Sequence, residues 1–100
     1  MKKHANRNDN DNEHHLYEIY DHELSTTYKY GICGNPLNVD GSSPRANIQV
    51  KEANRLVRWS RFFARILLIG IHGRVEAKRM EDEYIEAYRV KHGSKPAGNT

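Results

Sequence analysis

The segment "EAKRMEDEYI", residues 76–85, holds a carboxylate where a helix would turn it toward an apolar side. At about 100° per residue, Glu81 falls at about 40° from Ala77, inside the arc of apolar side chains. That arc comprises Ala77, Met80, Tyr84, Ile85, Ala87 and Tyr88. The neighbouring carboxylates lie outside it, so we expect only Glu81 to point inward.

A carboxylate on an apolar face is costly unless it is paired or binds a metal. One interpretation is a structural ion pair between Glu81 and an arginine of the preceding predicted helix. The other is a metal site. A single carboxylate ligand suits Mg²⁺, because this ion keeps several bound waters and takes further oxygen ligands from substrate phosphates. The sequence leaves both open.

The segment "HHLYEIYD" alternates in a strand pattern and places His15 on the same face as Tyr17. The imidazole of His15 could orient a water or protonate a leaving oxygen. His14, His22 and His72 fit surface or turn positions better. A zinc site is disfavoured, because close His pairs at helical spacing are absent and Cys33 is the single cysteine.

The elements that must position these groups follow from turn and periodicity signals. Strands are expected over "HHLYEIYD", "TTYKYGIC" and "FARILLIGI", the last of them buried. Ser43 followed by Pro44 has the form of a helix start, and a helix should run from Pro44 to Ser60. A second helix should run from Arg74 to about Val90 and end before Gly93.

The order β-β-α-β-α predicts an α/β fold with a central three-stranded sheet flanked by helices. The first helix would cover the sheet with Ile48, Val50, Ala53, Leu56, Val57 and Trp59. Arg55 and Arg58 share a side of this predicted helix, as either a phosphate-contacting stripe or a solvated face.

One hundred residues suffice for one domain, which we assign to residues 15–100. Residues 1–14 are polar and aperiodic and predict a disordered leader or linker. The net charge of +3 favours a polyanionic partner only mildly. The lone cysteine predicts a reducing compartment. The longest apolar run is shorter than the roughly 20 residues of a membrane span, and export would need another part of a larger protein.

Several short motifs together resemble the GIY-YIG nuclease family. His15-Leu16-Tyr17 resembles the first-strand signature, and Lys29-Tyr30-Gly31 in "KYGICG" resembles the second. "EAKRMEDEYI" resembles the metal-binding helix of the family. Lys29 departs from the pattern, because it stands where the family has a tyrosine and is flanked by Tyr28 and Tyr30.

The resemblance implies roles for individual residues. Glu81 would hold Mg²⁺ or Mn²⁺, and Arg45 would bind the scissile phosphate. Tyr17 or a neighbour would activate water, although a proton could also go to His15 or to a metal-bound hydroxide. Lys29 suits phosphate binding better than proton abstraction, because its unperturbed pKa is about 10.4.

The remaining substrate contacts would come from the second strand and the end of the chain. Gly31 would let the backbone approach a phosphate. Asn99 resembles the asparagine that ends the family's core. The substrate-binding set implied or suggested by the sequence is Tyr28, Tyr30, Gly31, Asn99, Arg55 and Arg58.

A compact domain behind a polar leader also resembles the C-terminal toxin module of a bacterial polymorphic or contact-dependent growth inhibition effector. This likeness implies secretion within a larger effector, action in the cytoplasm of the target cell and a cognate immunity protein. We expect a monomeric, metal-dependent endonuclease acting on DNA or RNA. A non-catalytic nucleic-acid-binding module and a protein-interaction domain are the alternatives.

Overall fold

The computed structural model describes residues 12–100, so most of the leader predicted over residues 1–14 lies outside the described residues. The elements are β1 (Glu13–Asp21), β2 (Thr26–Cys33), α1 (Pro44–Val57), β3 (Phe62–His72), α2 (Arg74–His92) and the short 3₁₀ helix η1 (Ala97–Asn99). The predicted α/β fold in β-β-α-β-α order is confirmed. None of the helices in this part of the chain is long and apolar enough to cross a membrane.

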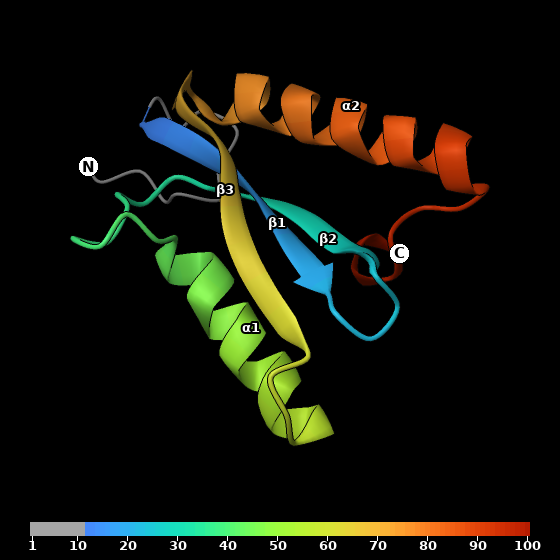
Figure 1. Cartoon of the computed structure of the whole chain (residues 1–100). Coiled ribbons are helices and arrows are strands. Elements are labelled where there is room, and N and C mark those ends of the chain that lie inside the picture. Colours follow the sequence, from blue (N-terminus) through green and yellow to red (C-terminus); the bar gives the residue numbers. More distant parts are fainter. Residues whose placement is uncertain (1–11) are drawn as a thin grey trace.

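The three strands form one antiparallel sheet in the order β2-β1-β3. The first strand of the chain is therefore the central one, paired with β2 along one edge and with β3 along the other. Helices α1 and α2 lie on opposite faces of this sheet (Figure 1).

Alternation along β1 divides the core into two layers. Tyr17 and Ile19 pack with Ala46 of α1, whereas Leu16 packs with Ala77 of α2. Because side chains of a strand point alternately to its two faces, the central strand contributes to both layers. It is the most completely buried strand, with only Glu13 exposed and Tyr20 partly exposed.

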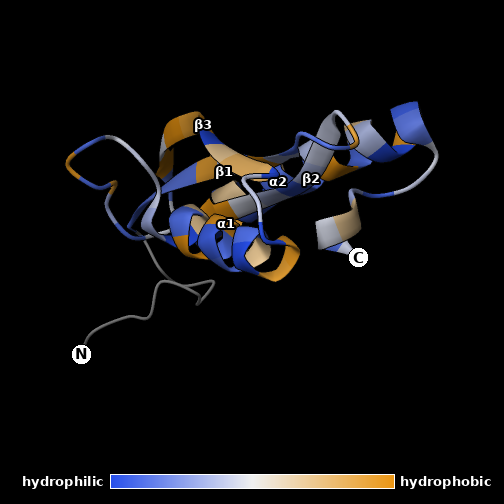
Figure 2. Ribbon diagram, turned by 60° about the horizontal axis from the view of Figure 1, so that its bottom comes forward, coloured by the Kyte–Doolittle hydropathy of each residue, from blue (hydrophilic) through white to orange (hydrophobic). Residues whose placement is uncertain are grey.

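The third strand differs from its prediction as a buried strand. It is largely hydrophobic (Figure 2), yet only Phe62 and Ile71 are buried, and Ile69 is 67% exposed. The reason is its place at an edge of the sheet, because β1 already occupies the centre. Apolar composition correctly predicted the strand but not its position.

Helix α1 ends at Val57, three residues before the predicted end. Arg58 takes a left-handed conformation with φ 66° and donates its backbone N–H to Asn54 O. The Asn54 amide also exchanges two hydrogen bonds with the backbone of Phe62, at 2.7 and 2.9 Å. These bonds turn the chain into β3 and stop the helix.

The predicted phase of α1 was also partly wrong. Val50, Ala53 and Val57 pack against the core as predicted, together with Ala46. Ile48, Leu56 and Trp59 are exposed instead. The helix needs only a narrow apolar stripe, because β1 and β3 supply most of the layer beneath it.

Strand β1 begins at Glu13, two residues before the predicted start of the domain. His14 is buried, and its Nδ1 donates a 2.6 Å hydrogen bond to the carbonyl of Asn12. A Cβ atom at Gly34 would lie 2.7 Å from Nε2 of His14. The glycine thus makes room for the histidine.

Gly31 makes room for Tyr17 in the same way. The two residues are partners in the β1–β2 register, and a Cβ atom at residue 31 would collide with the ring and hydroxyl of Tyr17. Glycines 31 and 34 therefore let two large side chains of β1 lie across the edge strand.

We predict that Gly31→Ala destabilises the fold by about 1–3 kcal/mol, the usual cost of forcing extra volume into a packed layer. In a Tyr17→Ala background the same substitution should cost less than half as much, because the ring it meets is gone. Urea unfolding of the four variants measures this coupling. Equal costs in the two backgrounds would contradict the contact.

Candidate functional site

Tyr17, Arg45 and Glu81 come from β1, α1 and α2, and the charges of the last two act on Tyr17. The charges of Arg45 and Glu81 both act on the Tyr17 hydroxyl: Arg45 lowers its pKa and Glu81 raises it. Arg45 and Glu81 are therefore both within electrostatic range of Tyr17, and all three were predicted as site residues. The gap at Gly31 is where the Tyr17 hydroxyl crosses β2.

The Tyr17 hydroxyl is held in its protonated form. Burial is the main cause that raises its pKa to about 12, and the hydroxyl donates a 2.8 Å hydrogen bond to Oε1 of Gln49. At neutral pH the hydroxyl keeps its single proton, which it donates to Gln49, and its oxygen can accept a hydrogen bond. It is poorly suited to accept a proton from water.

Arg45 occupies the second position of α1. Its Nη1 donates to the carbonyl of Ile32 in β2 at 3.2 Å, which ties the start of the helix to the edge strand. Its charge also lowers the pKa of His15. The guanidinium thus supplies positive charge close to both Tyr17 and His15.

His15 lies on the same strand face as Tyr17, as predicted, with ring centroids 6.3 Å apart. It is only 3% exposed, and its Nε2 is 2.7 Å from Oγ of Ser43. Ser43 Oγ in turn accepts the N–H of Ala46, which confirms Ser43 as the helix N-cap. His15 therefore positions the start of α1, and Arg45 with it.

Glu81 is 7% exposed on the inner side of α2, which confirms the helical-periodicity prediction. The ion-pair interpretation named a different partner from the one that the structure shows. Oε1 of Glu81 accepts from Nζ of Lys78, at 2.6 Å on the same helix, rather than from an arginine of α1. An i,i+3 pair forms within one helix face and needs no partner from another element.

Lys78 is a labile partner for a buried carboxylate. Its side chain is 48% exposed and also lies 3.5 Å from Asp82. The hydrogen bond with Glu81 is the main cause that raises the pKa of Lys78, so the lysine stays charged at neutral pH. The flexible, half-exposed ammonium group of Lys78 can move away if a cation of higher charge binds Glu81.

The donors around Glu81 fit only a cation that needs few protein ligands. Within residues 12–100 no three His, Cys, Asp or Glu side chains lie close enough together to hold a metal. Mg²⁺ and similar ions accept one carboxylate when waters and phosphates complete the shell. The single carboxylate thus fits Mg²⁺ or Mn²⁺ and fits zinc poorly.

The other predicted residues of β2 are held by structural contacts. The backbone N–H and C=O of Tyr30 both bond the side-chain amide of Asn99 at 2.9 Å, so Asn99 covers the edge of β2. Tyr28 packs on Phe62, with ring centroids 4.9 Å apart. Lys29 is half-buried and lies against Gly98.

Arg55 and Arg58 are exposed at the far end of α1 from Arg45. Because Arg58 lies beyond the helix in a left-handed conformation, the two do not continue one helical stripe. Neither is brought to the Tyr17 hydroxyl by the fold.

One family model, described as URI fold toxin 2, matches residues 7–93. The chain belongs to this family. It is therefore a toxin domain, in agreement with the predicted toxin module. Comparisons with curated proteins and with solved structures found no match.

Two polar neighbours in this URI fold toxin domain were missed from the sequence. Gln49 bonds Tyr17, and it follows Arg45 by four residues, so helical spacing already placed both on one side of α1. Lys78 precedes Glu81 by three residues, which is pairing distance. Both contacts thus follow from helical spacings that can be read from the sequence.

We predict that His15 makes the stability of this toxin domain depend on pH. Burial, followed by the charges of His14 and Arg45, lowers the pKa of His15 below 6.5. The unfolded chain therefore binds the proton more readily, and stability should fall as pH drops below about 6.5. Urea unfolding between pH 5 and pH 8 measures this, since the unperturbed pKa is about 6.5.

The substitution His15→Gln should flatten this dependence over the same range. His72→Gln, at an exposed position, is the matched control and should leave the slope unchanged. An unaltered slope in the His15 variant would show that another group carries the dependence.

Proposed function

We propose that this toxin domain is a metal-dependent endonuclease that hydrolyses phosphodiester bonds of DNA or RNA in the cytoplasm of a target bacterium. The observation that carries the proposal is that Arg45 of α1 and Glu81 of α2 both act electrostatically on the buried Tyr17 hydroxyl of β1. The resemblance of the two strand motifs and of α2 to GIY-YIG nucleases supports the same chemistry.

Arg45 would bind a non-bridging oxygen of the scissile phosphate. A fixed positive charge at that point stabilises the negative charge that grows in the transition state. Its bond to Ile32 O and the His15–Ser43 contact hold the start of α1 in place. The guanidinium would then need little rearrangement during the reaction.

The Tyr17 hydroxyl would accept a hydrogen bond from the attacking water, because its single proton is donated to Gln49. Its raised pKa of about 12 makes this role more suitable than proton abstraction. Gln49 fixes the direction of the hydroxyl. His15 would act as a positioning residue through Ser43, because its Nε2 is hydrogen-bonded to Oγ of Ser43.

Glu81 would hold Mg²⁺ or Mn²⁺ in place of the Lys78 ammonium. Such an ion, when bound, neutralises phosphate charge and lowers the pKa of water. We also propose that the domain is delivered as part of a larger effector and that a cognate immunity protein neutralises it.

A non-catalytic nucleic-acid-binding module is the second candidate. The Lys78–Glu81 ion pair favours it, because a carboxylate already paired within its helix needs no metal. The net charge of +3 would then serve phosphate contacts alone.

We predict that Glu81→Gln abolishes cleavage of plasmid DNA and total RNA while the thermal unfolding midpoint stays close to that of the unmodified domain. The amide keeps the volume of the side chain but is a weak metal ligand. Glu83→Gln removes an exposed carboxylate from the same helix and should keep activity. An active but destabilised Glu81→Gln variant would instead support a structural ion pair.

We predict that Arg45→Ala lowers the cleavage rate by about 10² to 10³, as expected when one charge-stabilising donor is lost. Binding of substrate should weaken much less. Lys51→Ala removes one exposed positive charge from the same helix and controls for the loss of charge. Equal losses of binding and rate in the Arg45 variant would favour the non-catalytic candidate.

A further inference from the structure

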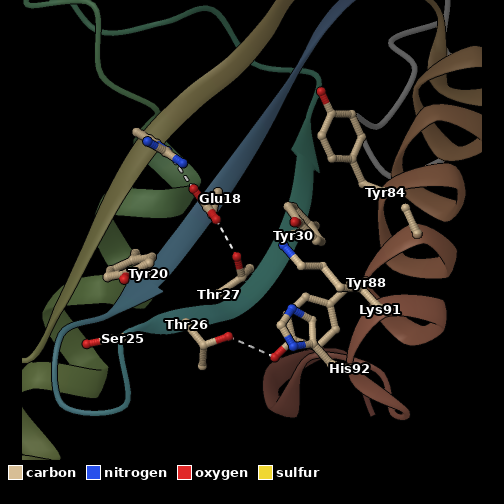
Figure 3. Close-up of a pocket in the computed structure, with 12 residues that line it drawn as sticks. Glu18, Tyr20, Ser25, Thr26, Thr27, Tyr30, Tyr84, Tyr88, Lys91 and His92 are labelled. Carbon is tan, nitrogen blue, oxygen red and sulfur yellow. Dashed lines mark hydrogen bonds and ion pairs between the residues drawn. The ribbon is translucent and has the colours of Figure 1, made fainter.

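A separate cavity lies between the sheet and the C-terminal half of α2 (Figure 3). Its volume is about 390 Å³, toward the lower end of the range of about 300–1,000 Å³ seen for ligand sites. Side chains from all three strands and from α2 line it. This tyrosine pocket, as we call it, is defined by Glu18, Thr27, Tyr30, Arg65, Tyr84, Tyr88, Lys91 and His92.

The walls of the tyrosine pocket are aromatic. Tyr30 of β2 and Tyr84 of α2 have ring centroids 5.3 Å apart, and Tyr88 and His92 have theirs 4.2 Å apart. Figure 3 shows these rings on the side of the pocket formed by β2 and α2. Aromatic faces of this kind stack on nucleobases irrespective of their sequence.

Two of the rings are anchored by hydrogen bonds. The Tyr88 hydroxyl lies 2.9 Å from Oγ1 of Thr26, and the backbone of Tyr30 is held by the Asn99 amide. An anchored ring loses little further freedom when a ligand stacks on it, so these contacts favour binding.

The floor of the tyrosine pocket is polar. Glu18, only 4% exposed, accepts hydrogen bonds from the hydroxyl of Thr27 and from Nε of Arg65. Two residues earlier on the same face, Leu16 packs against Ala77 of α2. Buried ion pairs can often be replaced by apolar side chains without loss of stability.

A carboxylate on the floor suits the polar edge of a base. Each carboxylate oxygen can accept more than one hydrogen bond, and the Watson–Crick edges of bases carry N–H donors. Arg65 and Lys91 add positive charge beside the cavity, where a sugar-phosphate chain would pass.

The tyrosine pocket adjoins the candidate active site. Tyr84 follows Glu81 by three residues and so lies on the same side of α2, one turn further along. Tyr30 packs on Tyr84 and so belongs to the α2 face of the sheet, whereas Gly31 and the Tyr17 ring belong to the α1 face. A nucleotide next to a phosphate held at Glu81 would lie along α2 toward the cavity.

We propose that the tyrosine pocket binds one unpaired nucleobase of a single-stranded nucleic acid. In a duplex the base faces are stacked and the Watson–Crick edges are paired, so neither could reach the rings or Glu18. The placement of this base beside the cleaved phosphate rests on the proposed function. The binding itself does not.

The test is fluorescence anisotropy with labelled hexauridylate, labelled hexathymidylate and a labelled DNA duplex, using the full chain in EDTA. Tyr88→Ala should weaken binding of the single strands by about 5- to 150-fold, as expected for one lost stacking interaction. Tyr88→Phe keeps the ring and should bind nearly as the unmodified domain does. Trp59→Ala, an exposed aromatic outside the pocket, should have no effect.

Salt dependence separates stacking from phosphate contact. Tyr88→Ala should leave the slope of log K against log salt unchanged, whereas Lys91→Ala should reduce it by about 0.7, the value for one phosphate of a single strand. A preference for the uridylate or the thymidylate would identify RNA or DNA as the source of the base.

The proposal is overturned if Tyr88→Ala binds single strands as tightly as the unmodified domain, or if the duplex binds as tightly with the same dependence on Tyr88. Cleavage is assayed in parallel with Mg²⁺. Tyrosine-dependent binding without any cleavage would overturn the nuclease function and leave the pocket assignment standing. Cleavage together with single-strand binding that does not depend on Tyr88 would overturn the pocket assignment and leave the nuclease function standing.

Discussion

The fold depends on the contact between the large side chain of Tyr17 and Gly31, a glycine with no side chain of its own. Tyr17 stands on the central strand, and its ring and hydroxyl occupy the space where Gly31 would carry a Cβ atom. This contact seats the α1 layer against the sheet and brings the Tyr17 hydroxyl to the edge of β2. It is there that the charges of Arg45 and Glu81 reach the same atom from opposite layers.

The polar groups around this edge form two supports of different stiffness. On the α1 side, buried His15 and Ser43 fix the start of the helix that carries Arg45. On the α2 side, Glu81 is paired with the half-exposed Lys78. The first support suits a group that must not move during a reaction. The second suits the proposed function, in which Glu81 exchanges the Lys78 ammonium for a metal ion.

Much of the fold was predictable from local patterns. Strand alternation placed His15 and Tyr17 on one face, helical periodicity placed Glu81 on the inner side of α2, and the Ser43-Pro44 pair marked the start of α1. These features depend on residues close together in the sequence. Apart from the local Lys78–Glu81 pair, the main errors concern contacts between elements.

The end of α1 depends on Asn54 bonding Phe62, and the burial of β3 depends on which strand occupies the centre. Neither can be read from a single segment. The tyrosine pocket escaped prediction for the same reason, because Tyr30, Tyr84 and Glu18 come from three elements.

The two edges of the sheet are unequal, and this bears on self-association. On the β2 edge, the Asn99 amide occupies the donor and acceptor of Tyr30 that an added strand would use. In the described part of the chain no strand pairs with the outer edge of β3, which carries exposed Phe63, Leu68 and Ile69. Uncovered apolar edges are templates for strand addition and aggregation. If copies of this domain join sheet to sheet, β3 is the edge at which they will do so.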